Sequence, residues 1–149
     1  MLRLLHELDF ARYVTGRVLA RSALALLCGT EPEAVRRTRC PGCGGAHGKP
    51  QALGGAARWE LSLMHSGDVV AVAVTQGFPV GLDVERLDDP PEPPPEAGLP
   101  PEYELVLTAE ERAAVIPLPR AERAAAFMTY WTCKEAALKA TGEGLTANS

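Results

Sequence analysis

The sequence of 149 residues lacks an apolar run long enough to cross a membrane. Its longest apolar runs, such as residues 23–28, fall far short of the roughly 20 residues that a spanning helix needs. Charged residues interrupt the N-terminal stretch, which is therefore a poor signal peptide. A long basic run is also missing, and the net charge of −4 gives no support for a nucleic-acid-binding protein.

Cysteine is scarce, with four residues in the chain. Cys40, Cys43 and His47 have a spacing that suggests zinc, but a structural zinc site normally has four ligands and no second cysteine pair is present. Cys28 or His65 would have to complete such a site, so we disfavour a zinc-stapled interaction module. Without a secretion signal, the cysteines are interpreted as reduced thiols, and we expect a cytoplasmic protein.

The composition is that of a globular protein, with 46% hydrophobic and 23% charged residues. The length allows one ordinary domain or two small lobes.

The first half of the chain predicts a long helix followed by strands. Residues 8–28 are expected to be helical and to stop at Cys28-Gly29. Residues 31–39 predict a second short helix, and the glycine-rich residues 39–55 predict a loop. Residues 58–63 predict a strand by alternation, residues 69–75 predict a buried strand, and residues 80–85 predict the next strand after a turn.

The second half predicts helices after a break in regular structure. Residues 88–101 contain seven prolines and should form an extended surface loop. Residues 108–111 form a capping box that should open a short helix ended by Pro117. Residues 120–141 are the strongest helix prediction, with Gly142 just past the helix end.

Two acidic clusters are the candidate metal-binding residues of the chain. Asp83 and Glu85 are two residues apart on the expected strand, so their carboxylates should lie side by side. Glu135 lies on the helix stripe that should pack inward, where a carboxylate needs a partner or a cation. Carboxylate oxygens suit Mg²⁺. The alternatives are solvated carboxylates on an edge strand and an ordinary helix pair of Glu135 with Lys139, worth about 0.3–0.5 kcal/mol.

The order and spacing of these clusters resemble those of the 4′-phosphopantetheinyl transferases. The resemblance rests on Val-Gly-Leu-Asp-Val-Glu at residues 80–85 and on Trp-x-x-Lys-Glu-Ala-x-x-Lys-x-x-Gly-x-Gly-Leu at residues 131–145. It implies an enzyme that moves the phosphopantetheine arm of coenzyme A onto a serine of an apo acyl or peptidyl carrier protein. It also implies that Asp83, Glu85 and Glu135 ligate Mg²⁺, that Lys139 contacts the reacting phosphates, and that Asp83, Glu135 and Lys139 are catalytic. Lys134 lies on another side of the helix and is expected to be solvated.

Three further segments match the family and imply a coenzyme A site. Lys49 and Pro50 belong to a Gly-Lys-Pro segment that would line the nucleotide site, and this segment is not a P-loop. His65, in His-Ser-Gly, would bind the 3′-phosphate side of coenzyme A, although a structural histidine at a strand end is the alternative. Arg12 on the first helix would reach a coenzyme A phosphate. Met64 stands where the family has a small hydroxyl residue.

The resemblance implies an α+β fold of two pseudo-symmetric lobes, each a small antiparallel sheet packed on a long helix. We expect residues 1–79 to form the lobe that binds the nucleotide of coenzyme A and residues 80–149 to form the catalytic lobe. The eighty residues before Asp83 resemble the two-lobed, surfactin-type enzymes, from which the chain departs by its shortness at both ends. We therefore expect a truncated second lobe. The alternative function is an inactive remnant that binds coenzyme A or a carrier protein.

Overall fold

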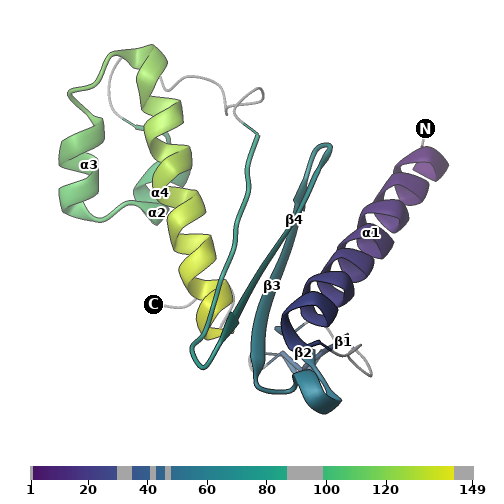
Figure 1. The fold of residues 1–149 in the computed structure, drawn as a ribbon. Coiled ribbons are helices and arrows are strands. Elements are labelled where there is room, and N and C mark those ends of the chain that lie inside the picture. The colour runs from purple at the N-terminus through teal and green to yellow at the C-terminus, as the bar shows by residue number, and fades with distance from the viewer. Residues whose placement is uncertain (1, 30–34, 41–42, 46–47, 87–98, 143–149) are drawn as a thin grey trace. The chain divides into compact units, whose positions relative to one another are not determined.

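The computed structural model describes residues 2–29, 35–40, 43–45, 48–86 and 99–142 (Figure 1). It divides into two compact units, residues 1–84 with 135–149, and residues 85–134. The predicted lobe boundary between residues 79 and 80 stays a prediction. The α+β class is confirmed, because an antiparallel sheet and helices are both present.

The first unit contains a long helix and one four-stranded sheet (Figure 1), together with the last turns of the C-terminal helix. The order of strands is β1-β2-β3-β4, and all neighbours are antiparallel. The elements are α1 (Leu2–Cys28), β1 (Val35–Arg37), β2 (Pro50–Ala52), the 3-10 helix η1 (Gly54–Ala56), β3 (Trp59–Ser66) and β4 (Val69–Gln76). The hairpin of β3 and β4 is in register from Trp59–Gln76 to Ser66–Val69, so both predicted strands are confirmed, each slightly longer than expected.

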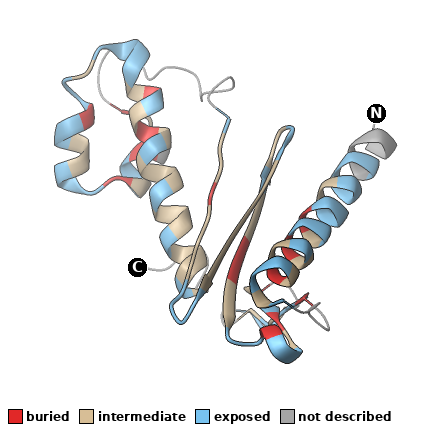
Figure 2. Ribbon diagram, in the orientation of Figure 1, coloured by how far each residue is buried: buried red, intermediate tan, exposed pale blue. Residues whose placement is uncertain are grey.

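Helix α1 packs on the sheet through a stripe of buried residues at every fourth position. Gly16, Ala20 and Leu24 are buried, whereas most of the remaining helix surface is exposed (Figure 2). A Cβ atom at Gly16 would lie 3.5 Å from Val70 and 3.8 Å from Leu63, so the helix runs close to the hairpin. The core around this stripe contains the buried residues Ala20, Leu24, Val35, Ala52, Ala56 and Leu61.

Several expectations for the first unit are wrong. Residues 35–37 of the expected second helix form strand β1, because Val35 and Arg37 pair with Ala52 and Pro50 across the sheet. Residues 50–56 of the expected loop contain β2 and η1. Strand β4 is half-buried along most of its length. Residues 80–85, expected as a strand, have no strand assignment. The part of the second prediction that covers residues 31–34 lies outside the described residues.

The second unit contains α2 (Pro101–Val106), α3 (Ala109–Val115) and most of α4 (Arg120–Thr141). Its core cluster contains Leu99, Tyr103, Leu107, Val115 and Phe127, and the rings of Tyr103 and Phe127 stack at 3.7 Å. The expected sheet of a second lobe is not seen here, since residues 85, 86 and 99–134 include no strand. Most of the expected proline-rich loop, residues 88–98, lies outside the described part of the chain.

Local sequence signals set the helix ends in this unit. Thr108 caps α3, and the capping box is complete, because Thr108 accepts from Glu111 N–H while Glu111 accepts from Thr108 N–H. Helix α4 has the predicted bounds, and Gly142 follows it with a φ of 80°. Helix α2 was not predicted. It begins at Pro101, a residue that suits the first turn because its missing N–H would have no helical partner.

Candidate functional site

The segment of residues 80–84 is held against the last two turns of α4 by a glycine. A Cβ atom at Gly81 would lie 1.7 Å from the carbonyl oxygen of Ala136 and 2.6 Å from the amide nitrogen of Ala140. No side chain fits there, so only glycine allows this approach. The next amide, of Leu82, donates to Ser62 Oγ on β3 at 3.0 Å. The segment is thus fixed by contacts with β3 and α4, without ladder hydrogen bonds.

Asp83 and Lys139 form the central ion pair of the site. The Asp83 side chain is 1% exposed, and its Oδ1 accepts a hydrogen bond from Lys139 Nζ. Lys139 Nζ also donates to Met64 Sδ at 3.1 Å, so β3, α4 and the 80–84 segment meet at one ammonium group. A buried carboxylate needs such a cation to remain charged. Asp83 and Lys139, predicted from two separate motifs, are therefore brought together.

The fit to a magnesium ion rests on Asp83. Its second oxygen, Oδ2, is buried and accepts no hydrogen bond from any described residue, which leaves a lone pair for a cation. Glu135 shares the first unit with Asp83, whereas Glu85 belongs to the second unit. Within the described ranges, no three His, Cys, Asp or Glu side chains are grouped closely enough to hold a metal. The magnesium assignment therefore stays a prediction for these three carboxylates.

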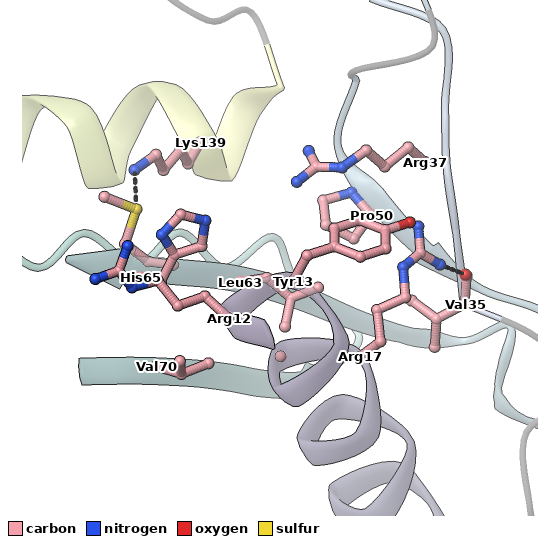
Figure 3. A pocket seen from close by; sticks show the side chains of 12 residues that line it. Arg12, Tyr13, Arg17, Val35, Arg37, Pro50, Leu63, His65, Val70 and Lys139 are labelled. Carbon is pink, nitrogen blue, oxygen red and sulfur yellow. Dashed lines mark hydrogen bonds between the residues drawn. The ribbon is translucent and has the colours of Figure 1, made fainter. Parts of the chain in front are cut away.

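A pocket of about 260 Å³ opens beside the ion pair in the first unit (Figure 3). Five basic side chains line it, and no Asp or Glu is among its lining residues. The basic residues are Arg12, Arg17, Arg37, His65 and Lys139; the others are Tyr13, Gly16, Val35, Pro50, Leu63, Met64 and Val70. Asp83 pairs with Lys139 and Asp9 pairs with Arg12 at 2.9 Å, but neither carboxylate is among the lining residues. Basic groups on walls that are otherwise apolar attract an anion, because the field is focused where water is excluded. The pocket is therefore suited to a phosphate-bearing ligand.

Four of the predicted coenzyme A residues line this pocket, and one does not. Arg12, Pro50, His65 and Lys139 are on its wall, from α1, β2, β3 and α4. Lys49 is absent from the lining. Its Nζ donates to Glu60 Oε2 at 2.6 Å and to the carbonyl oxygen of Ala140 at 2.9 Å. Lys49 thus fastens the end of α4 to β3.

The sequence analysis missed two arginines of the pocket. Arg17 lines the pocket from α1 and donates to the carbonyl oxygen of Val35. Arg37 lines the pocket from strand β1, and the sequence analysis did not predict this strand. A signal for Arg17 was available in the sequence, because it lies next to the small Gly16, where a helix can approach a neighbouring element closely.

Lys134 was predicted to be solvated, and this is wrong. In the second unit its Nζ donates to the carbonyl oxygen of Val106 at 2.6 Å and to Glu111 Oε2 at 2.5 Å. The hydrogen bonds from Lys134 and from the Thr108 backbone hold the pKa of Glu111 below its ordinary value of 4.5. Lys134 therefore joins α4 to α2 and α3.

The zinc hypothesis gains no support. No disulfide joins the described cysteines Cys28, Cys40, Cys43 and Cys133. His47, which zinc would require, lies outside the described residues.

Among the residues that the structure describes, no helix is both long enough and apolar enough to span a bilayer.

Comparison with known proteins finds similarity to 4′-phosphopantetheinyl transferases. Residues 79–148 match the 4′-phosphopantetheinyl transferase superfamily. The transferase HetI of Nostoc sp. is 34% identical over 139 residues, which cover 90% of this chain and 53% of that protein. The transferase AcpT of Salmonella typhimurium is 32% identical over 132 residues, covering 89% of this chain and 59% of that protein. The transferase psf-1 of Bacillus pumilus is 32% identical over 88 residues, covering 59% of this chain and 34% of that protein.

The chain spans about half the length of the first two relatives, 53% and 59%. The matched region of residues 79–148 contains Asp83 and Lys139, which form the buried ion pair, together with Glu85 and Glu135. The three relatives are all named 4′-phosphopantetheinyl transferases. Together, these matches show that the chain is similar to 4′-phosphopantetheinyl transferases.

Proposed function

We propose that this chain transfers the 4′-phosphopantetheine arm of coenzyme A to a serine of an apo carrier protein, and that 3′,5′-ADP leaves. The observation that carries the proposal is the pocket with five basic side chains that ends at the Asp83–Lys139 pair. Coenzyme A carries a pyrophosphate and a further phosphate on its ribose. A basic pocket with no carboxylate among its lining residues fits this nucleotide end, and the names of the relatives fit the reaction.

The roles of the residues follow from their chemistry. Lys139 holds the reacting pyrophosphate, where its ammonium offsets the charge that develops on the leaving 3′,5′-ADP. Arg12 and His65 contact phosphates, and Pro50 forms an apolar wall. The carrier serine oxygen bonds to the β-phosphorus while the bond from that phosphorus to the bridging oxygen of 3′,5′-ADP breaks. The serine proton passes to a base, for which Asp83, Glu135 and bulk water are the candidates.

Magnesium would be held by Asp83, Glu85 and Glu135, and when bound it would neutralise the charge on the pyrophosphate. The partly unsatisfied, buried carboxylate of Asp83 supports this assignment. Asp83 also orients Lys139, whose ammonium it binds directly. The surfactin-type, two-lobed organisation is part of the same proposal.

The experiment is to incubate the chain with Mg²⁺, coenzyme A and an apo carrier protein and to weigh the carrier by mass spectrometry. The carrier should gain the mass of one phosphopantetheine group. A carrier whose acceptor serine is replaced by alanine is the control and should gain nothing. An unchanged carrier mass, when coenzyme A binding is measurable in the same sample, would refute the transfer and leave a binding protein.

A further inference from the structure

Strand β3 carries a row of three side chains that hold the parts of the candidate site together. Glu60, Ser62 and Met64 share one face of this strand, because residues two apart in a strand point to the same side. Ser62 and Met64 act directly, since they accept hydrogen bonds from the 80–84 segment and from Lys139. Glu60 is the third member of the row, and it acts through a second side chain.

That second side chain is Lys49, which is anchored to the sheet at both ends. Its Nζ donates to Glu60 Oε2 at 2.6 Å, and its side chain is only 16% exposed. Its carbonyl oxygen accepts from the amide of Thr38 at 3.0 Å and from Thr38 Oγ1 at 3.1 Å, just after β1. The ammonium of Lys49 is therefore held at a fixed place beside β3.

The anchored ammonium of Lys49 binds the end of α4. It donates to the carbonyl oxygen of Ala140 at 2.9 Å. Carbonyl groups in the last turn of a helix have no helical donor, and the helix dipole favours a cation there. Ala140 directly follows Lys139, whose Nζ contacts Asp83 and Met64 (Figure 3). Two consecutive residues of α4 are thus tied to β3, one through its carbonyl and one through its side chain.

These two ties fix both the rotation and the axial position of the last turn of α4. Successive residues are about 100° apart around a helix, so the two contacts lie at different points around its axis. The last turn cannot rotate or slide without breaking one of them. The place of the Lys139 ammonium therefore depends on the contact that Lys49 makes with the neighbouring carbonyl.

We propose that Glu60 and Lys49 are positioning residues for Lys139 in the transfer reaction. Lys49 holds the last turn of α4 in place, and Glu60 directs the ammonium of Lys49. This inference rests on the proposed function. The motifs assign no role to Glu60, and the resemblance gives Lys49 a different role, that of lining the nucleotide site. A residue that contacts coenzyme A contributes to its binding, whereas a positioning residue contributes to the chemical step, so the two roles of Lys49 are distinguishable.

The first measurement is the steady-state rate of carrier labelling at varied coenzyme A. Lys49→Met should lower kcat at least about tenfold, because misplacing a reacting group by about 1 Å can cost about a hundredfold in rate. Glu60→Gln should lower kcat about threefold or more, since glutamine still accepts a hydrogen bond but carries no charge. The KM for coenzyme A should change less than about twofold in both variants.

Two further variants serve as rescue and control. Lys49→Arg should keep most of the parent kcat, because arginine retains the charge and enough donors for the carboxylate and the carbonyl. Asp68→Asn removes an exposed carboxylate from the turn of the same hairpin, and it should change neither constant. The double variant of Lys49→Met with Glu60→Gln should be no slower than Lys49→Met alone, because Glu60 then has nothing to direct. Additive losses would show that Glu60 acts by another route.

The second measurement does not depend on activity. The side-chain ammonium of Lys139 is followed by nitrogen NMR and assigned by its loss in Lys139→Arg. Asp83→Asn gives the signal of Lys139 without its carboxylate partner. Lys49→Met and Glu60→Gln should move the Lys139 signal toward that position, and Asp68→Asn should leave it unchanged. Circular dichroism verifies that each variant is folded, and if Lys49→Met is not, Glu60→Gln and Lys49→Arg decide.

The outcomes separate this inference from the proposed function. A higher KM for coenzyme A with an unchanged kcat in Lys49→Met would overturn the positioning role and assign Lys49 to the ligand. A Lys139 signal that stays in place in both variants would overturn it as well. Labelling by the unaltered chain is measured in parallel. If the carrier gains no mass while the Lys139 signal moves as expected, the transferase function is overturned and the positioning of Lys139 stands.

Discussion

Among substitutions that add a single methyl group, Gly81→Ala should damage the candidate site most. The new Cβ would lie 1.7 Å from the Ala136 carbonyl oxygen, whereas an ordinary contact begins at 3.4 Å. The obstructing atoms belong to the backbone of α4, so no rotamer change relieves the clash. The 80–84 segment must withdraw, which breaks the hydrogen bond from Leu82 N–H to Ser62 and draws Asp83 away from Lys139.

The magnitude follows from two terms. An overpacked contact costs about 1–3 kcal/mol, and a lost intramolecular hydrogen bond costs about 0.5–1.5 kcal/mol. We therefore expect Gly81→Ala to lower the free energy of unfolding by about 2–4 kcal/mol. Each kcal/mol lost corresponds to a fall in Tm of about 3–4 °C. Because Lys139 loses its fixed partner, carrier labelling should fall at least tenfold even at temperatures where the variant is folded.

Gly16→Ala is the matched control for stability. It makes the same chemical change, but its Cβ would meet Val70 at 3.5 Å and Leu63 at 3.8 Å, which are ordinary contacts. Alanine is also the better helix former by about 1 kcal/mol, so this variant should be at least as stable as the parent. Chemical denaturation of both variants gives the comparison. Equal stability of Gly81→Ala and the parent would refute the argument that close backbone packing holds the 80–84 segment.

Three further predictions concern helices α3 and α4. Glu135→Gln should reduce carrier labelling by about a hundredfold or more with an unchanged Tm, and undiminished labelling would exclude Glu135 from the chemistry. Lys134→Met should lower the Tm by a few degrees, because it removes the bonds to Val106 and Glu111, and an unchanged Tm would show that they contribute nothing. Since folding lowers the pKa of Glu111, its stabilisation is present above pH 4.5 and is lost as the pH falls through the lower folded pKa. The parent and Glu111→Gln should therefore differ in Tm near neutral pH and converge in acid; a constant difference down to pH 3 would contradict this pKa shift.

The elements that the sequence predicted well are those determined by local signals. The capping box at Thr108 and the glycine after Thr141 each need only a few adjacent residues, and both were confirmed. Strand β1 depends instead on pairing with β2, whose residues lie some fifteen positions away. The 80–85 segment has the composition of a strand, but Gly81 brings it onto α4, where it has no ladder partner. A pattern of side chains cannot report such backbone contacts.

In the candidate site, too, local motifs predicted some features, whereas contacts between distant residues were not predicted. Two motifs predicted that Asp83 and Lys139 belong to one site, but the ion pair between them was not predicted. Lys49 was assigned to the ligand from its motif, yet the structure gives it Glu60 and the end of α4 as partners. A motif reports which residue types occur together. It does not report whether a cation faces a ligand or a neighbouring carboxylate.

Helix α4 shows why adjacent residues of one motif act differently. Successive residues are about 100° apart around a helix, so Lys134 and Glu135 point in different directions, whereas Glu135 and Lys139 are about 40° apart and share a face. Lys134 accordingly bonds within the second unit, to Val106 and Glu111, while Lys139 bonds within the first, to Asp83. The spacing Lys-Glu-x-x-x-Lys thus assigns one lysine to holding helices together and the other to the site. One alanine inserted between Glu135 and Lys139 would rotate Lys139 by about 100° around the helix, away from Asp83. This insertion should abolish carrier labelling, while the contacts of Lys134 persist.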